Sequence, residues 1–552
     1  TTTGGRTGIL IHGAAAGGSS TLTASAGPFT LTGTSSGTAP SAGQEGIILN
    51  GVVDGGTGNL TLATSNLLAA NTGSETSATA RGTGTLTVKP TVAASVGVGA
   101  AATGDLLLTE ALLSTFQDGF RYVTLGDTAK TTTLTVNTTR TFTDSLALVN
   151  SGTSPMVLNS TVDVGGNTLT LTSGGTVSGS GNILANKLLL NGSGDYTLAT
   201  ATGHRINTIA AATPNTVDFI NQQSFEVGTA SPPSNVAVEG VSTATAVTLE
   251  ASGAASNFTV TKGVNTPLMT LVAGGLFNNV GGGAGRYLIY AGDPTTSNIG
   301  VTGPGYNKHY NQTYVRGSTP AYASSGSWGF FRTTPTLTVS AVDATKVYGT
   351  AVSSADLLGY TGFIDGDTLT NTNLSGSAGF ALTGTSSGSG NHVVGAHTAT
   401  LSGLGSLANA LGYALQIGAT TTSTLTVTPK PLDVSVTTQN KTYDATPNAT
   451  ISGTSIAPIA GDVLTLGGGA ATVAAFASKQ VGVNKPVTLT SANYSLSGAD
   501  AGNYTLVQPL ASTADITRAT ITLSGITADN KVYDRTTNAT FTGVPLLTAL
   551  AG

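Results

Sequence analysis

Short runs in which Leu, Val or Ile alternates with Thr recur through the first 280 residues of the chain. Residues 85–88, 133–136 and 168–171 are examples, and each run is bounded by Gly, Asn, Asp or Ser. Side chains of a β-strand point alternately to its two faces, so such a run predicts a half-buried strand. The runs follow one another about every ten residues, a spacing typical of a sandwich, a barrel or a coiled solenoid.

The length of this first region favours the solenoid. The region is too long for a usual single sandwich, and no Pro-rich linker divides it. Stacked turns bury a narrow aliphatic interior, since each turn needs only its neighbours. We therefore expect an all-β protein that begins with a right-handed parallel β-helix over residues 1–281. Leu134, Val136, Leu169 and Leu171 should lie inside, and their Thr neighbours outside.

Composition excludes several classes of protein. Charged residues make up 9% of the 552 residues, the net charge is −5, Gly numbers 75 and Cys is absent. Such low charge is unusual for helical enzymes and gives no basic surface for nucleic acid. Disulfides and thiolate sites are excluded, and no apolar run of about 18 residues predicts a membrane-spanning helix. The chain starts at Thr1 without a signal segment, so we expect an internal fragment of an exported protein.

Aromatic residues concentrate in residues 282–332, where Tyr306, Tyr310, Tyr322 and Trp328 are examples. Aromatic side chains can seal the open end of a solenoid, and they can also stack on sugars. We favour a cap or junction over a carbohydrate site.

The rest of the chain is explicitly repetitive. Asn440-Lys-Thr-Tyr-Asp recurs as Asn530-Lys-Val-Tyr-Asp, and a more divergent copy contains Lys346-Val-Tyr-Gly. These spacings define a first copy (residues 333–429), a second copy (430–518) and the start of a third copy (519–552). A structural role in the repeat is expected for ten residues: Lys346, Tyr348, Asp367, Lys441, Tyr443, Asp444, Asp462, Lys531, Tyr533 and Asp534.

Two resemblances follow from these residues. Residues 106–126 and 181–198 are similar to the β-helix of filamentous-haemagglutinin-like exoproteins, adhesins exported by two-partner secretion. The first copy resembles MBG modules and the later copies YDG modules of bacterial surface exoproteins, with Ala445 and Arg535 replacing the Gly of YDG. The resemblance implies small all-β modules of sandwich or β-grasp-like type, used as spacers or adhesive stalks. It also implies an outer-membrane transporter as partner and an extracellular or cell-surface location.

No catalytic, cofactor-binding or metal site is expected. Asp365 and Asp367 could hold Ca²⁺, but an Asp-Gly turn is the simpler interpretation, because the second copy has Ala460 in place of Asp365. His392 and His397 lack nearby carboxylates, so metal binding by them is not favoured. Regular Thr rows that bind ice would need a flatter, more regular repeat than these residues offer.

The sequence thus predicts a non-enzymatic adhesin or adhesive stalk that projects from the cell or acts in a biofilm. Its receptor is not identified, with carbohydrate as one candidate class, and neither nucleic-acid binding nor membrane insertion is expected. The alternative is a β-helix lyase or hydrolase of acidic glycans, which needs clustered carboxylates. The acids of the first region are isolated in sequence: Asp54, Asp105, Asp163, Asp195 and Asp218.

Overall fold

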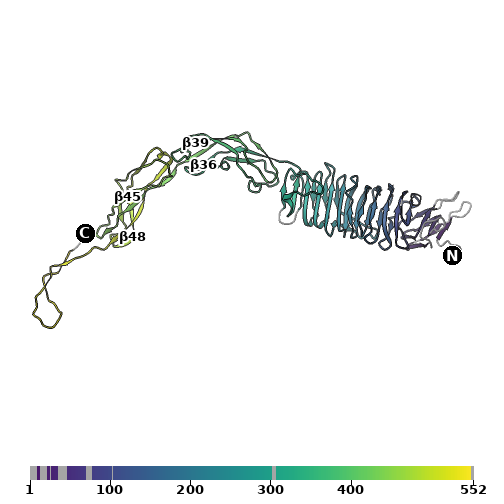
Figure 1. The fold of residues 1–552 in the computed structure, drawn as a ribbon, viewed down its shortest axis with the longest axis horizontal. Helices are drawn as coiled ribbons and strands as arrows, with labels where there is room; N and C mark the ends of the chain where they lie inside the picture. The colour runs from purple at the N-terminus through teal and green to yellow at the C-terminus, as the bar shows by residue number, and fades with distance from the viewer. Residues whose placement is uncertain are drawn as a thin grey trace. The chain divides into compact units, whose positions relative to one another are not determined.

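The computed structural model describes residues 9–12, 21–24, 26–34, 46–69, 78–101, 103–300 and 306–548. The chain divides into two compact units. The first unit comprises residues 1–336, 363–373 and 409–414, and the second comprises residues 337–362, 374–408 and 415–552. Nearly all regular structure in both units is β-strand (Figure 1).

The first unit is a parallel β-helix, and its strands stack in successive turns in Figure 1. One face is formed by strands that pair in parallel from turn to turn: β3 (Phe29–Gly33), β6 (Leu60–Thr64), β9 (Thr85–Lys89), β12 (Tyr122–Gly126), β15 (Leu146–Val149) and β18 (Thr168–Thr172). A second face is formed in the same way by β10 (Ala94–Val98), β13 (Thr131–Val136), β16 (Met156–Leu158) and β19 (Val177–Ser178). Shorter strands such as β14 (Arg140–Thr141) and β17 (Val162–Asp163) form a third. This architecture is the one that the alternating runs predict.

The interior of the β-helix is aliphatic in its earlier turns and aromatic in its later turns. Leu134, Val136, Leu169 and Leu171 are buried, as predicted. Residues from four later strands continue the interior as a column of rings: Phe219 in β23 (Thr216–Asn221), Phe225 in β24 (Phe225–Val227), Phe258 in β29 (Phe258–Val260) and Phe277 in β31 (Phe277–Asn279). Phe225 and Phe258 stack with ring centroids 4.6 Å apart. In-register stacking thus brings equivalent side chains of neighbouring turns into direct contact.

Part of the outer face of the β-helix is covered by another segment of the chain. Thr170 points out of the β-helix but is only 1% exposed. Its in-register neighbour Leu189, in β20 (Ile183–Asn191), is covered by a hairpin of β25 (Thr229–Ala230) and β26 (Val238–Glu239). The hairpin follows β24 and packs Ala230 and Val238 against the outside of the sheet. A Thr on the outer face is therefore not always in contact with solvent.

The β-helix also extends beyond residue 281. Strand β32 (Gly283–Ala291) pairs in parallel with β30 (Val264–Ala273), and β34 (Trp328–Phe331) pairs with β32. The aromatic segment expected as a cap thus contains three more strands of the same sheet: β32, β34 and β33 (Asn307–His309), which pairs with β34. Among the described residues, no helix is long and apolar enough to span a membrane.

The second unit contains most of the first copy together with the second copy. In the first copy, one sheet has the strand order β37 (Leu358–Thr361), β35 (Thr336–Ala341), β40 (Ala414–Ile417). The other has the order β36 (Ala344–Val347), β41 (Thr422–Thr428), β39 (Gly395–Gly403), β38 (Gly379–Leu382). Strands β36 and β41 are parallel, whereas β41, β39 and β38 are antiparallel.

The second copy repeats the four-stranded sheet, with the order β44 (Lys441–Thr442), β51 (Ala511–Thr517), β48 (Gly482–Thr490), β47 (Val473–Phe476). In this sheet β44 pairs in parallel with β51, just as β36 pairs in parallel with β41 in the first copy. Shorter pairs complete the copy: β42 (Lys430–Asp433) with β50 (Tyr504–Val507), β43 (Ser435–Thr438) with β45 (Ile451–Ser455), and β46 (Thr465–Gly468) with β49 (Tyr494–Ser497). The described part of the third copy has only two short pairs: β52 (Leu523–Ser524) with β55 (Leu546–Leu547), and β53 (Thr527–Ala528) with β54 (Phe541–Thr542).

Candidate functional site

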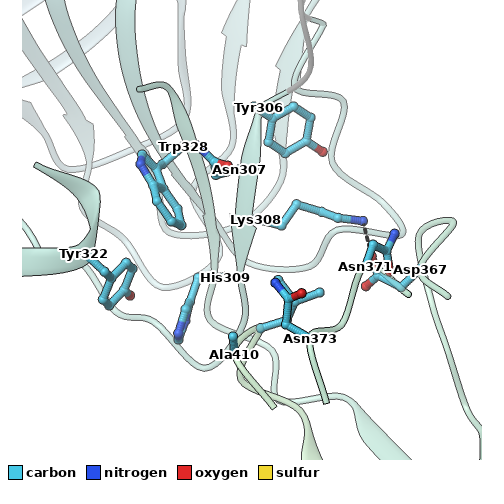
Figure 2. A pocket seen from close by; sticks show the side chains of 11 residues that line it. Tyr306, Asn307, Lys308, His309, Tyr322, Trp328, Asp367, Asn371, Asn373 and Ala410 are labelled. Atoms are coloured by element: carbon cyan, nitrogen blue, oxygen red, sulfur yellow. Dashed lines mark ion pairs between the residues drawn. The ribbon is translucent and has the colours of Figure 1, made fainter. Parts of the chain in front are cut away.

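A pocket of about 580 Å³ opens in the first unit beside the last strands of the β-helix (Figure 2). Tyr306, Lys308 and His309 reach it from β33 (Asn307–His309) and the residue before it, and Trp328 reaches it from β34. Asp367, Asn371 and Asn373 come from the loop 363–373 of the first copy. Aromatic and polar groups from distant parts of the sequence therefore share one cavity.

Aromatic rings form one side of the pocket. His309 and Tyr322 are stacked with centroids 4.7 Å apart, and the Tyr322 ring lies 5.3 Å from that of Trp328. Burial lowers the pKa of His309, and its Nδ1 lies 2.7 Å from the Tyr310 carbonyl oxygen. At neutral pH the imidazole is thus uncharged, with its proton on Nδ1 and an acceptor lone pair on Nε2. Tyr322 is 46% exposed, so part of this aromatic surface faces solvent.

Charged and amide groups lie on the other side of the pocket, as Figure 2 shows. The Lys308 ammonium pairs with Asp367 at 2.7 Å and with Asp365 at 3.1 Å. Asn371 and Asn373 are exposed. The side-chain oxygen of Asn371 accepts a 2.7 Å hydrogen bond from the Thr368 amide, and its NH₂ group makes no hydrogen bond to another described residue.

Behind the pocket, two tyrosine hydroxyls converge on the buried carboxylate of Asp367. Tyr310 donates at 2.6 Å and Tyr413 at 2.7 Å. The Tyr413 oxygen in turn accepts a hydrogen bond from the Ile364 amide at 3.1 Å. Burial, with a further effect of the Asp367 charge, raises the pKa of Tyr413 to about 12. Asp367 is one of the two residues for which calcium binding was considered as an alternative to a turn. Its carboxylate contacts these two hydroxyls and the Lys308 ammonium.

The turn that carries Asp367 is the expected Asp-Gly turn. Asp365 and Gly366 both have positive φ angles, of 52° and 72°. That combination is typical of a type I′ turn, which Asp-Gly sequences favour. Within the described residues, no cluster of three or more His, Asp or Glu side chains is arranged to hold a metal ion.

The second unit contains the same arrangement around Asp462. Tyr348 and Tyr504 each donate a 2.7 Å hydrogen bond to this carboxylate, and the Ile459 amide donates to the Tyr504 oxygen at 2.9 Å. Asp462 also accepts a hydrogen bond from the Ser389 amide of the first copy at 3.1 Å. Two of these three donors to Asp462, Tyr348 and Ser389, therefore belong to the preceding copy.

The repeated lysines stabilise loops within their own copies. Lys441 pairs with Asp444 at 2.8 Å and donates to the carbonyl oxygens of Thr446 and Asn448. In the third copy, Lys531 and Asp534 repeat this pair at 2.9 Å. Lys346 instead pairs with Asp356 at 2.6 Å.

The three motif tyrosines differ in their environments. Tyr348 is 1% exposed, Tyr443 is half-buried against the core of its own copy, and Tyr533 is 86% exposed. The structure therefore brings Tyr348 and Asp462 together but leaves Tyr443 and Tyr533 away from any Asp-Tyr pair.

Acidic residues on the β-helix are less isolated than the sequence indicates. Arg316 pairs with Asp218 and, at 2.5 Å, with Glu250, which lie on neighbouring turns. Because one guanidinium binds both carboxylates, the cluster holds the loop that carries Arg316 against the sheet. Arg316 was not singled out from the sequence, and Tyr413 and Tyr504 were expected only as strand residues of the repeat, not as hydrogen-bond donors to Asp367 and Asp462. The Gly-Tyr and Gly-Asn-Tyr motifs that precede β40 and begin β50 were the available signal for the tyrosines.

Comparison with known protein families gives one match. The YDG domain family matches residues 428–514, the strands β42 to β50 and the start of β51. This segment of the chain is therefore similar to YDG domains. Neither the curated proteins nor the solved structures include a match to the chain. The resemblance of the YDG-type copies is thus confirmed for the second copy, whereas these comparisons give no support to the haemagglutinin resemblance.

Proposed function

We propose that this chain is part of a secreted or surface-displayed bacterial exoprotein that acts as an adhesin or an adhesive stalk. The observation that carries the proposal is the YDG domain, which follows a copy with the same order of strands in its four-stranded sheet. Serial β-modules of this kind suggest a surface- or adhesion-related role. The haemagglutinin-like pattern of the β-helix supports export through an outer-membrane transporter.

The pocket beside β33 and β34 is the surface that we propose for the receptor, with carbohydrate as the ligand class. Sugars present apolar C–H faces together with hydroxyl groups, and aromatic rings beside amides complement both. Tyr322, Trp328 and His309 supply the rings. The exposed amides of Asn371 and Asn373 supply donors and acceptors for hydroxyls.

An attachment assay tests this proposal. Beads coated with the whole chain should attach saturably to bacterial or host surfaces, and a soluble glycan should compete. Trp328→Ala and Tyr322→Ala should reduce attachment, while Tyr533→Ala, which removes an exposed ring elsewhere, serves as the control. Absence of attachment by the wild-type chain would contradict the adhesive role. Unchanged attachment of both pocket variants would contradict the assignment of this pocket.

We further propose that the chain is not an enzyme. A glycan lyase or hydrolase would need free carboxylates on the β-helix, and the pair Asp218 and Glu250 is bound by Arg316. Incubation with acidic polysaccharides should release no reducing or unsaturated ends. Release by the wild-type chain that is lost in Asp218→Asn would instead establish the enzymatic alternative.

A further inference from the structure

We propose that the paired Tyr and Asp of each copy form a receptor for a tyrosine of the preceding domain, and that the surface around Tyr443 docks a further YDG-type module. The receptor is called here the acceptor pair: Asp367 with Tyr413 in the first copy, and Asp462 with Tyr504 in the second. The tyrosine that enters it is called the donor tyrosine: Tyr310 and Tyr348, respectively.

The two acceptor pairs have the same geometry. Each Asp accepts hydrogen bonds from its own Tyr at 2.7 Å and from a donor tyrosine at 2.6 or 2.7 Å. In both, the amide of the Ile three residues before the Asp donates to the acceptor Tyr. A hydroxyl–carboxylate hydrogen bond is charge-assisted and therefore strong. The repetition of these four groups in two copies indicates that the arrangement is a property of the module.

The two donor tyrosines come from unrelated structures. Tyr310 directly follows β33 of the β-helix, whereas Tyr348 follows β36 in the first copy. The acceptor pair is thus constant while the domain that supplies the donor changes. The acceptor pair therefore binds a tyrosine hydroxyl of the preceding domain, whatever the fold of that domain.

The contact around Tyr348 extends over both copies. Tyr348, Leu425 and Val427 of the first copy share one apolar cluster with Leu432 and Tyr504 of the second. Two amides of the first copy also bind side chains of the second: Ser389 donates to Asp462 at 3.1 Å, and Val394 donates to Asn503 at 2.9 Å. The hydroxyl contact is therefore the centre of a larger interface.

Tyr443 occupies the donor position of the second copy, and its surface is open. Its ring packs against a buried cluster of its own copy that includes Phe476 and Ile516, and its hydroxyl has no hydrogen-bond partner in the part of the chain that the structure describes. Val473, 58% exposed, and Val483, 78% exposed, are apolar residues on the same four-stranded sheet. The acceptor Asp lies 19 residues after the motif tyrosine in both complete copies, and in the third copy that position is Gly552. A module with a complete acceptor pair fits this surface.

The existing interface provides the first test, by hydrogen exchange of the full chain. Tyr348→Phe and Asp462→Asn should each accelerate exchange of the Ser389 and Val394 amides about tenfold or more, since these amides are protected by the second copy. The amide of Ala399, inside β39, reports that the first copy stays folded. Tyr443→Phe is the matched control and should change nothing. Unchanged exchange at Ser389 and Val394 in both interface variants would overturn the proposal.

A chain extended by one complete module tests Tyr443 itself. Residues 520–552 are replaced by a second copy of residues 430–518, which supplies a new Asp and Tyr at the repeat spacing. Val481 directly precedes β48, so it occupies the position that Val394 has before β39. The added module should protect the Val481 amide as the second copy protects that of Val394, and its exchange should be about tenfold slower in the extended chain. Tyr443→Phe should remove that protection there while leaving the Val394 amide unaffected. Equal exchange of the Val481 amide in the extended and original chains would overturn the docking role of Tyr443.

Discussion

The Tyr348 hydroxyl of the first copy donates a 2.7 Å hydrogen bond to the carboxylate of Asp462 in the second copy, 114 residues further along the chain. Tyr504 donates to the same carboxylate from within the second copy. Burial acts to raise the pKa of Asp462, but hydrogen bonds from Ser389, Tyr504 and Tyr348 outweigh it and lower the pKa to about 2. The ionised carboxylate is thus the form that the interface requires.

Acid should weaken this interface. The folded pKa of Asp462 lies below the ordinary value of 3.8, so the unfolded chain binds the proton more readily. The stability contributed by Asp462 is therefore present above about pH 4 and is lost as the pH falls toward 2. Thermal unfolding of the full chain at pH 5, 3 and 2 measures this loss. Asp462→Asn should show a smaller fall in midpoint, and an identical fall in both proteins would contradict the prediction.

Ala445→Gly should stabilise the second copy. Ala445 has a φ of 65°, in the left-handed region where a Cβ atom is unfavourable. Relief of that strain exceeds the entropy that Gly loses on folding, for a net gain of about 0.5–1 kcal/mol in the free energy of unfolding. Urea unfolding measures the gain. Ala449→Gly, at a position without positive φ, should destabilise the copy, and a loss of stability in Ala445→Gly would refute the strain.

Thr170→Val should stabilise the β-helix. Thr170 is buried under the outer surface, and its hydroxyl has no hydrogen-bond partner among the described residues. Valine has nearly the same shape and removes the cost of burying an unpaired hydroxyl, about 1 kcal/mol. Calorimetric unfolding of Thr170→Val and of the half-exposed control Thr168→Val checks this. A lower midpoint for Thr170→Val would mean that the hydroxyl makes a hydrogen bond in solution.

The β-helix should lose stability as the pH falls below that of neutral solution. The His204 ring is buried, stacks on Phe219 and accepts a 2.8 Å hydrogen bond from the Ile183 amide through Nδ1. Burial lowers its pKa below the ordinary 6.5, so protons bind the unfolded chain more tightly. Stability is thus full above about pH 6.5 and declines as the pH falls through and below that value.

Urea unfolding at pH 7.5 and pH 5 tests the His204 prediction. His204→Gln should be less stable than the wild type at pH 7.5, because the Ile183 amide loses its partner. Its stability should nevertheless depend less on pH. An equal pH dependence in the two proteins would show that His204 is not the group responsible.

Much of the fold could be predicted from local patterns. The alternation at Leu169 and Leu171 indicates an inward face because the strand period is fixed by backbone geometry. The return of Lys441, Tyr443 and Asp444 as Lys531, Tyr533 and Asp534 likewise indicates a repeated loop. Lys441 and Lys531 both contact the Asp three residues later and the Thr five residues later, since these partners are close in sequence.

The candidate pocket was only partly predictable. The aromatic residues near Trp328 were visible as a cluster in the sequence. Asn371 and Asn373, which give the pocket its amides, lie about 40 residues later in a loop with no distinguishing pattern. Only the folded chain places that loop beside β33 and β34.

The sequence by itself determined which residues alternate, which motifs repeat and hence the all-β architecture, because these depend on neighbours a few positions apart. Tertiary structure alone decided that Thr170 is buried, that a distant hairpin covers Leu189, and that Asp218 and Glu250 share Arg316. It also decided that Asp462 binds Tyr348, while Tyr443, at the equivalent motif position, has no such partner among the residues that the structure describes. A hydroxyl or a carboxylate can bond to any suitable group that folding brings near, so its partner is fixed by the packing of distant segments.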